Sequence, residues 1–184
     1  MSSRYIIALV GMPGTGKSQA ALFFKNKNIP IVRFGDLTDE TMKEKGLPST
    51  PVNERIVREQ LRKELGMAAY AICAKPKIEE ASKASTIIVL DGLYSWEEYA
   101  FLKKYFPHLL LLHIFASPEH RYDRLAVRKI RPLNPQEARQ RDVFEIENLN
   151  KAGPIAMANY VIFNENTVED LYKKLEELLT KIQI

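Results

Sequence analysis

Eight consecutive residues of the sequence have the types and the spacing needed to bind phosphate. Residues 11–18 read Gly-Met-Pro-Gly-Thr-Gly-Lys-Ser and match the phosphate-binding pattern G-x-x-x-x-G-K-[ST] at every fixed position. The glycines allow successive backbone N–H groups to converge on an anion at the start of a helix. The sequence therefore predicts a nucleotide triphosphate site formed by Gly11, Met12, Pro13, Gly14, Thr15, Gly16, Lys17, Ser18 and Gln19.

The segments on both sides of this loop have the structure that the loop needs. The apolar residues 5–10 predict a buried strand, and residues 18–25 predict a helix. In that setting the ammonium group of Lys17 reaches the β- and γ-phosphates, and the hydroxyl group of Ser18 ligates Mg²⁺. A glycine-rich turn with a chance Lys-Ser pair is the alternative, and the preceding strand argues against it.

Two aspartates follow strand-like runs and could act at the same edge of a sheet. Asp91 closes the β-branched run 86–90 and is predicted to hold Mg²⁺ or a water bound to it, because a charge that ends a buried strand needs a partner. Asp36 follows the strand-like run 29–34, at the place where open α/β sheets bind ligands, and is a candidate to contact a phosphoryl acceptor. An N-cap of the next helix is the alternative for Asp36.

Arginines recur at helical spacing in two places. Arg124 and Arg128 are four residues apart and lead into a proline-marked basic segment, where an arginine can close over a transferring phosphoryl group. A solvated basic helix face is the alternative. Arg55, Arg58 and Arg62 could form a basic face that binds the acceptor, but acidic residues are interleaved with them, so an exposed helix with ion pairs is the alternative.

The length and composition limit the protein to a few classes. A chain of 184 residues with 46% hydrophobic content is expected to form a single domain, residues 1–184. The 27 basic and 23 acidic residues are spread along the chain, which favours a small anionic molecule over a nucleic acid as the partner. The single cysteine and the lack of an apolar run of membrane-spanning length lead us to expect a cytoplasmic protein without a membrane segment. The sequence predicts no oligomeric state.

Hydrophobic periodicity and turn residues divide the chain into alternating strands and helices. The expected strands are 5–10, 29–34, 86–91, 109–115 and 158–163. The expected helices are 18–25, 37–45, 52–65, 67–74 with Pro76 bending or ending it, 95–105, one beginning at 118, 135–150 and one after a cap at Thr167. The leucine-rich strand 109–115 is expected to be covered on both faces, as in a parallel sheet.

The order of these motifs resembles the nucleoside-monophosphate kinase superfamily. The phosphate-binding loop, Gly35-Asp36, Asp91-Gly92, the helix with Arg124 and Arg128, and the turn 164–167 follow one another as they do in adenylate kinases, dephospho-coenzyme A kinases and a branch related to them. The likeness covers essentially the whole chain. It implies an α/β, three-layer P-loop kinase fold with a five-stranded parallel sheet and helices on both faces. It also implies an acceptor-binding helical insert at about residues 37–66, a short lid at about 128–135, and ATP and Mg²⁺ as cofactors.

The resemblance also implies roles for individual residues. Arginines that match Arg124, Arg128 and Arg141 hold the donor and transferred phosphates in such enzymes, and the turn that begins at Asn164 usually borders adenine. The residues predicted to take part in catalysis are Lys17, Arg124, Arg128 and Asp36, and those predicted to bind the acceptor are Asp36, Arg55, Arg58, Arg62, Asp91 and Arg141.

The chain departs from adenylate kinases at two places that concern the acceptor. Asp39 stands where adenylate kinases carry an arginine that grips the acceptor phosphate, and Leu93-Tyr94-Ser95 replaces an aromatic, a proline and a second arginine. Because a desolvated phosphate needs fixed donors, losing both arginines weakens the case for a nucleoside monophosphate. Either the arginines of the predicted helix 52–65 substitute, or the acceptor presents a hydroxyl group that a carboxylate near Asp36 orients or deprotonates.

These observations predict an ATP- and Mg²⁺-dependent phosphotransferase. Its acceptor would be a nucleotide or nucleoside-containing small molecule, such as a nucleoside monophosphate or a molecule like dephospho-coenzyme A. The alternative is a nucleotide-binding switch or adaptor that hydrolyses ATP slowly and has no phosphoryl acceptor.

Overall fold

Five parallel strands form one sheet at the centre of the computed structural model, which describes residues 5–182. The strands are β1 (Tyr5–Val10), β2 (Ile31–Arg33), β3 (Ile87–Asp91), β4 (Leu109–Phe115) and β5 (Tyr160–Phe163). Their order across the sheet is β2-β3-β1-β4-β5, and each neighbouring pair is parallel. This arrangement confirms the predicted five-stranded parallel sheet.

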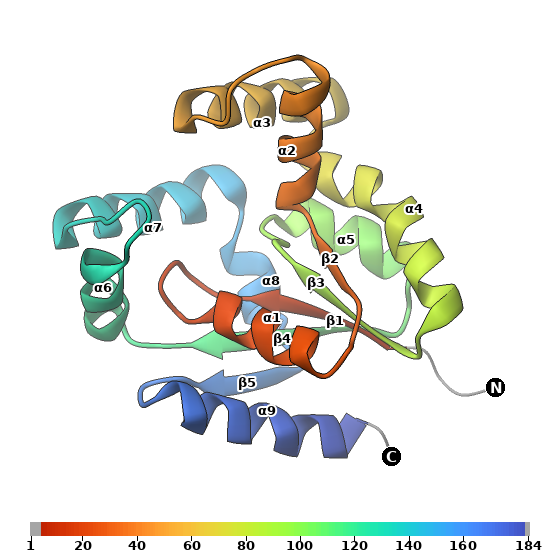
Figure 1. Cartoon of the computed structure of the whole chain (residues 1–184), viewed down its shortest axis with the longest axis vertical. Helices are drawn as coiled ribbons and strands as arrows, with labels where there is room; N and C mark the ends of the chain where they lie inside the picture. The colour runs from red at the N-terminus through yellow and green to blue at the C-terminus, as the bar shows by residue number, and fades with distance from the viewer. Residues whose placement is uncertain (1–4, 183–184) are drawn as a thin grey trace.

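Helices cover both faces of the sheet (Figure 1). They are α1 (Lys17–Asn26), α2 (Gly35–Glu44), α3 (Pro51–Leu65), α4 (Ala69–Ala84), α5 (Trp96–Tyr105), α6 (Pro118–Val127), α7 (Pro135–Leu149), α8 (Ala152–Ala156) and α9 (Val168–Ile182). Helices α4 and α5 pack on one face, and α1 and α9 pack on the other. The predicted three-layer architecture is confirmed.

The central strand β1 contributes side chains to both hydrophobic clusters. Ile6 and Ala8 belong to the cluster under α4 and α5, whereas Ile7 and Leu9 belong to the cluster under α1 and α9. Successive side chains of a strand point to opposite faces, so a strand that is apolar at every position must be covered on both sides. The continuous apolar run before the phosphate-binding loop therefore places β1, and with it the start of the loop, in the middle of the molecule.

The register of the strands brings the candidate site residues to one edge of the sheet. Asp91, at the end of β3, is level with Leu9 of β1 and with Arg33 of β2. All strands are parallel, so the residues that follow them emerge at the same edge. Helices α2 and α3 rise on one side of this edge, and α6 and α7 stand on the other side (Figure 1).

Several predicted element boundaries were wrong. Helix α4 does not end at Pro76, as one of the two predicted possibilities had it, but continues to Ala84. Proline costs a helix interior about 3 kcal/mol, but Ala74 and Ile78 on either side of it are buried, and their packing holds the helix together. Strand β2 is limited to three residues, and the short helix α8 had no signal in the sequence pattern.

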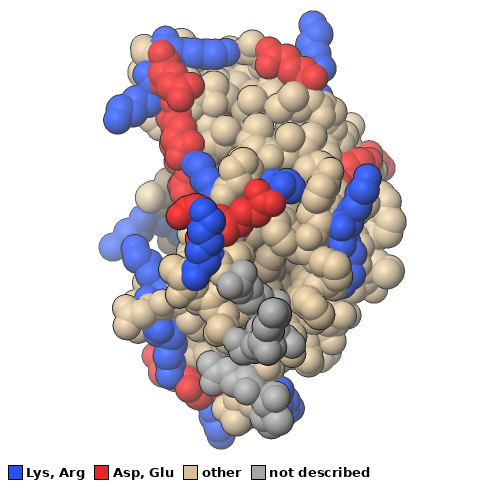
Figure 2. All heavy atoms as spheres, turned by 90° about the vertical axis from the view of Figure 1, so that its right-hand side faces the viewer, with Lys and Arg blue, Asp and Glu red and all other residues tan. Residues whose placement is uncertain are grey.

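Charges of both signs are mixed on the surface. On the face shown in Figure 2, basic side chains lie near acidic ones in several places, with large uncharged areas between them. Lys75 and Glu79, one turn apart on α4, form an ion pair of this kind with an N–O distance of 2.6 Å. None of the helices within residues 5–182 is both long enough and apolar enough to cross a membrane. A cytoplasmic location and the lack of a nucleic-acid partner stay predictions.

A buried carboxyl group fixes the loop between Asp91 and α5. Glu98 is fully buried, and its Oε2 accepts hydrogen bonds from the backbone N–H groups of Tyr94 (2.7 Å) and Ser95 (3.1 Å). The hydroxyl oxygen of Ser95 accepts a hydrogen bond from the N–H of Glu98 in return, which completes a capping box at the start of α5. Burial raises the pKa of Glu98 to about 7.

We expect Glu98→Gln to change how stability depends on pH. The pKa of Glu98 in the folded protein lies above its ordinary value of 4.5, so the folded state holds this proton to a higher pH than the unfolded state does. The contribution of Glu98 to stability is therefore fully present below pH 4.5 and is lost as the pH rises through 7. A glutamine keeps the acceptor oxygen but never ionises.

Urea denaturation at a series of pH values measures this effect. The free energy of unfolding of Glu98→Gln, relative to the native protein, should rise by about 3 kcal/mol between pH 4.5 and pH 8. Glu119→Gln, at an exposed position of α6, is the control for replacing a surface carboxylate. A difference that stays constant with pH would show that Glu98 does not titrate in the way its burial implies.

Candidate functional site

The phosphate-binding loop between β1 and α1 is folded around the side chain of Lys17. The ammonium group of Lys17 donates hydrogen bonds to the carbonyl oxygens of Gly11 (2.8 Å) and Met12 (2.9 Å). Burial lowers its pKa to about 7; Lys151 lowers it further, while Glu145 and Asp91 oppose the shift. Burial disfavours the charged form of Lys17, so a nearby anion such as a bound phosphate would stabilise the ammonium group strongly.

The loop conformation requires glycine at two positions. Gly14 and Gly16 have φ values of 82° and 95°, in the left-handed region that other residues rarely adopt. A Cβ atom on Gly14 would lie 2.7 Å from the carbonyl oxygen of Arg121, and one on Gly16 would lie 2.3 Å from Nδ2 of Asn164. The same Nδ2 donates to the carbonyl oxygen of Thr15 at 2.8 Å. The loop therefore forms a tightly supported cradle that fits a polyphosphate.

Ser18 and Asp91 offer the oxygen ligands that Mg²⁺ prefers. Both line the same cavity of about 600 Å³. Burial raises the pKa of Asp91, and the cations of Lys17 and Arg33 oppose this shift. Within residues 5–182 there is no group of three or more His, Cys, Asp or Glu residues that could hold a metal ion. A hydroxyl group and one carboxylate are too few ligands to hold a metal by themselves, but they suit a Mg²⁺ ion whose other ligands are phosphate oxygens and water.

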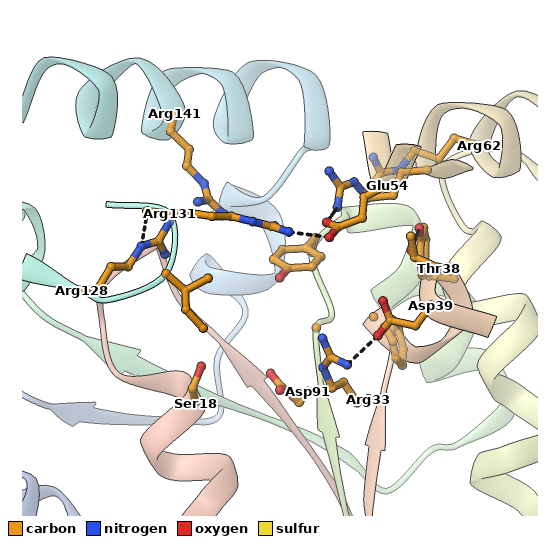
Figure 3. Close-up of a pocket in the computed structure, with 17 residues that line it drawn as sticks. Ser18, Arg33, Thr38, Asp39, Glu54, Arg62, Asp91, Arg128, Arg131 and Arg141 are labelled. Carbon is orange, nitrogen blue, oxygen red and sulfur yellow. Dashed lines mark hydrogen bonds and ion pairs between the residues drawn. The ribbon is translucent and has the colours of Figure 1, made fainter. Parts of the chain in front are cut away.

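The cavity has arginines on three sides (Figure 3). Its wall is formed by the ends of β2 and β3, by α2, α3 and α4, and by residues between α6 and α7. The lining residues are Ser18, Arg33, Phe34, Gly35, Thr38, Asp39, Glu54, Arg58, Arg62, Tyr70, Asp91, Gly92, Tyr94, Arg128, Ile130, Arg131 and Arg141. Six of the predicted site residues are thus brought together, namely Ser18, Arg58, Arg62, Asp91, Arg128 and Arg141.

Arg55 does not line the cavity with Arg58 and Arg62, so the predicted acceptor-binding set of three arginines was wrong in this one residue. The side chain of Arg55 is 70% exposed and lies 3.6 Å from Glu59 in an ion pair. Seven residues turn a helix by almost two full turns, so Arg55 points in nearly the same direction as Arg62 but lies two turns nearer the start of α3, where it is exposed. Arg58 and Arg62 face the cavity, and Arg55 follows the predicted alternative of an exposed, ion-paired position.

Asp36 lies outside this cavity. Helix α2 begins at Gly35, so Asp36 is a residue of its first turn and the predicted N-cap position was wrong. The carboxylate of Asp36 accepts a hydrogen bond from Arg33 at 2.7 Å and lines an adjoining groove that also contains Ser18 and Asp91. Asp39, one turn later, accepts from the same guanidinium at 3.0 Å and does line the cavity.

Arg124 and Arg128 do not lie on one helix face, because α6 ends at Val127 and Arg128 has an extended backbone. This departs from the predicted pair. Arg124 lies 3.4 Å from the carbonyl oxygen of Asn166 in the turn that precedes α9. Arg128 lines the cavity and donates to the carbonyl oxygen of Arg131. Arg141 of α7 also faces the cavity, and its Nε donates to Glu145 at 2.9 Å.

Sequence reasoning missed a buried ion pair behind the loop. Arg121 is 5% exposed, and its guanidinium donates to both carboxylate oxygens of Asp142 at 2.9 and 2.6 Å. It also donates to the carbonyl oxygens of Pro13 (3.1 Å) and Ala116 (3.2 Å). This one side chain therefore joins α6, α7 and the phosphate-binding loop. In the sequence Arg121 is one of several basic residues in an arginine-rich helix, so its residue type alone did not indicate that it would be buried and paired.

Sequence reasoning also missed other residues of the cavity wall, among them two arginines and two tyrosines. Arg33 ends β2, where a charged residue after an apolar run was a usable signal. Arg131 reaches Glu54 of α3 from the segment after α6, and no local pattern predicts this contact. Tyr94 lies under the ammonium group of Lys151, 4.5 Å from the ring centre, and burial raises its pKa to about 12. Tyr70 faces the cavity from α4.

Comparison with known proteins places the chain in a family. Residues 7–145 match the model of the AAA domain family. A UPF0200 protein of Thermococcus sibiricus is 34% identical over 183 residues, which are 97% of this chain and 96% of that protein. The chain belongs to the AAA domain family and to the UPF0200 proteins.

Solved structures show the fold that this UPF0200 chain shares. TT1252 of Thermus thermophilus superimposes with a TM-score of 0.68 at 20% identity, covering 97% of this chain and 98% of that one. A shikimate kinase of Bacteroides thetaiotaomicron has a TM-score of 0.60 at 16% identity, covering 96% and 98%. At these identities the likeness concerns the fold alone, and it confirms the P-loop kinase-like fold that the motifs of the sequence implied.

We expect Asp142→Asn to destabilise this UPF0200 chain strongly. The substitution leaves the guanidinium of Arg121 buried without its counter-charge, which typically costs about 3–5 kcal/mol. Asp123→Asn, at an exposed position of α6, should change the free energy of unfolding by less than about 0.5 kcal/mol. Urea denaturation at pH 7 measures both. Equal effects of the two variants would contradict a central role for the Arg121–Asp142 pair.

Proposed function

We propose that the protein is an ATP- and Mg²⁺-dependent phosphotransferase that moves the γ-phosphoryl group to a nucleotide or nucleoside-containing small molecule. One observation carries this proposal. Ser18, at the end of the phosphate-binding loop, and Asp91 lie on the wall of the same cavity that arginines of α3 and of residues 128–141 line from above. A donor at the loop and an acceptor in the cavity would thus meet in one enclosed space.

The residues of the loop have roles that follow from their chemistry. The backbone N–H groups of residues 11–18 and the ammonium group of Lys17 would bind the phosphates, and Gln19 follows them in the first turn of α1. Ser18 and Asp91 would hold Mg²⁺, directly or through water. When bound, Mg·ATP supplies the phosphoryl group and a good leaving group. The protein contributes position and charge, which account for most of the catalysis of phosphoryl transfer.

Arginines on one side of the cavity suit the transferring group. Arg128 and Arg141 face the cavity from the side of α6 and α7, and burial and neighbouring arginines lower the pKa of Arg128. Guanidinium groups stabilise charge that spreads over phosphoryl oxygens. Arg124 lies beside the turn of Asn164 and Asn166, so we assign it to the nucleotide rather than to the transferred group.

The helical insert at residues 37–66 and the segment 128–135 would bind the acceptor and close over it. Both contribute residues to the cavity, and Glu54 of the insert pairs with Arg131 of the other segment across it. Asp39 faces the acceptor space, and Asp36 stands beside Ser18 in the adjoining groove. Either carboxylate could orient a hydroxyl group of an acceptor, so we propose both as candidates.

A nucleotide-binding switch that hydrolyses ATP slowly is the second candidate. The Glu54–Arg131 contact favours it, because an ion pair between two segments that flank a nucleotide site can open and close with the bound nucleotide. In a switch no acceptor would bind in the cavity, and opening or closing of the cavity would control whether water reaches the bound ATP. The two functions differ in whether turnover requires a second substrate.

Measurement of ADP release distinguishes these functions. The protein is mixed with Mg·ATP and, in separate reactions, with nucleoside monophosphates, nucleosides and dephospho-coenzyme A. We expect ADP release to depend on one of these acceptors, and Lys17→Ala to abolish both ATP binding and turnover. Lys27→Ala, exposed at the end of α1, is the control. Slow hydrolysis that no acceptor accelerates would reject the phosphotransferase and support the switch.

Arg128→Ala tests the arginine assigned to the transferring group. We expect kcat to fall by about 10³-fold while the affinity for ATP is largely kept, because this guanidinium acts on charge that develops during transfer. Lys129→Ala, at the next and exposed position, should leave both quantities near their native values. A similar loss of ATP affinity and of turnover in Arg128→Ala would mean that Arg128 binds the ground state instead.

A further inference from the structure

Some charged residues of helix α3 line the cavity, and others are exposed to solvent. Glu54, Arg58 and Arg62 are spaced four residues apart and line the cavity. Arg55 and Glu59 do not line it, and their side chains are 70% and 68% exposed. The helix thus carries two arginines and a glutamate on the cavity wall, and an exposed arginine and glutamate that can serve as matched controls.

Most arginines of the cavity already have a carboxylate partner. Arg33 pairs with Asp36 and Asp39, Arg141 pairs with Glu145, and Arg58 and Arg131 share Glu54. Within residues 5–182, Arg62 makes no ion pair, and its Nε is buried with no hydrogen-bond partner. A buried donor without an acceptor is costly, so this guanidinium is suited to a ligand that brings one.

The guanidinium of Arg62 is held in place by aromatic packing. Its central carbon lies 5.6 Å from the ring centre of Tyr70, and the hydroxyl group of Tyr70 lies 2.6 Å from that of Thr38. Tyr70 and Thr38 are buried and line the cavity. Arg62 therefore belongs to a rigid wall built by α2, α3 and α4, and an anion that binds there does not have to order a flexible side chain.

The same wall lies away from the place of phosphoryl transfer. Figure 3 shows Arg62 on α3, at the opposite side of the cavity from Ser18 and Asp91. An anion at Arg62 is therefore not the group that the loop holds or transfers. Such an anion would be part of a second molecule, bound in the cavity beside the nucleotide.

Glu54 reduces the positive charge at this end of the cavity. Its side chain is 12% exposed and accepts hydrogen bonds from Arg58 and Arg131. The hydrogen bond from Arg131 keeps the pKa of Glu54 below its ordinary value although burial opposes this, so Glu54 is ionised at neutral pH. It occupies two guanidinium groups that an incoming anion would otherwise contact.

We propose that Arg62 binds an oxyanion of the acceptor, a phosphate or a carboxylate group, and that Glu54 is a specificity-determining residue that limits how much negative charge this end of the cavity accepts. The assignment of this ligand as the acceptor rests on the proposed phosphotransferase function. The binding of an anion at Arg62 does not, so the two can be tested separately.

Calorimetric titration tests the role of Arg62 with matched ligand pairs. The protein is first saturated with Mg²⁺ and a non-hydrolysable ATP analogue, and then titrated with AMP or adenosine, and with shikimate or its methyl ester. We expect the anionic member of at least one pair to bind more tightly than the neutral member, and the pair concerned identifies phosphate or carboxylate. Arg62→Gln should weaken binding of that anion by about tenfold or more, whereas Arg55→Gln should not.

The role of Glu54 is tested with the same ligands. Removing its charge frees Arg58 and Arg131, so Glu54→Gln should strengthen binding of the anion by about three- to tenfold and leave the neutral member of the pair unchanged. Glu59→Gln, the exposed counterpart on α3, should change neither. Weaker anion binding in Glu54→Gln would show that Glu54 merely holds the wall in shape and would overturn its proposed role.

Two further results would overturn the proposal. One is equal binding of the charged and neutral members of both pairs by the native protein. The other is equal anion binding by Arg62→Gln and Arg55→Gln, with thermal unfolding showing that both variants are folded. Acceptor-dependent ADP release is measured in a separate reaction, so phosphotransfer can be established while anion binding at Arg62 fails, and anion binding can be found in a protein that transfers no phosphoryl group.

Discussion

The candidate site depends on how the carbonyl groups of the phosphate-binding loop are held. The ammonium group of Lys17 donates hydrogen bonds to the carbonyl oxygens of Gly11 and Met12. Arg121 donates to the carbonyl oxygen of Pro13, and Asn164 donates to that of Thr15. Backbone carbonyl groups that are tied to donors behind a loop leave its N–H groups to face a ligand. Two of these donors come from distant parts of the chain, so the loop has its shape only when the whole sheet and its helices have assembled.

A second constraint is the balance of charge in the cavity. Six arginines in one enclosed space would repel one another, and burying charges without partners is costly. The chain places a carboxylate beside most of them, from α2, α3 and α7. The residues that keep an uncommitted cation, Arg62 on one side and Arg128 on the other, then stand out as those available to a ligand.

This balance bears on the departures from adenylate kinases. Asp39 replaces an acceptor-binding arginine, but it pairs with Arg33, so the exchange does not leave the cavity acidic. Arg62 supplies a cation from a different helix, backed by Tyr70. The loss of two arginines from the sequence pattern is therefore compensated in space, and the cavity still has the character expected for an anionic molecule.

The sequence alone determined the features that depend on neighbouring residues. The phosphate-binding loop with its strand and helix and the five strands follow from local patterns, the resemblance implied that the strands form one parallel sheet, and the structure has each of these features. The residues Ser18, Asp91, Arg58 and Arg62 could be selected because their spacing and their place at strand ends or on a helix face indicate where they point. The order of the motifs along the chain then carried the family resemblance.

Tertiary structure decided what distant residues do to one another. Arg121 contacts Asp142 and the loop, Arg131 contacts Glu54, and α4 continues through Pro76 with Ala74 and Ile78 buried on either side of it. Arg121 is 108 residues away from Pro13 in the chain, and Arg131 is 77 residues away from Glu54. The type of a charged residue does not predict which residue it will pair with, because the pairing depends on how distant elements pack together. Spacing along the chain therefore predicted the phosphate-binding loop, and only the folded chain showed which arginines of the cavity have a carboxylate partner within residues 5–182.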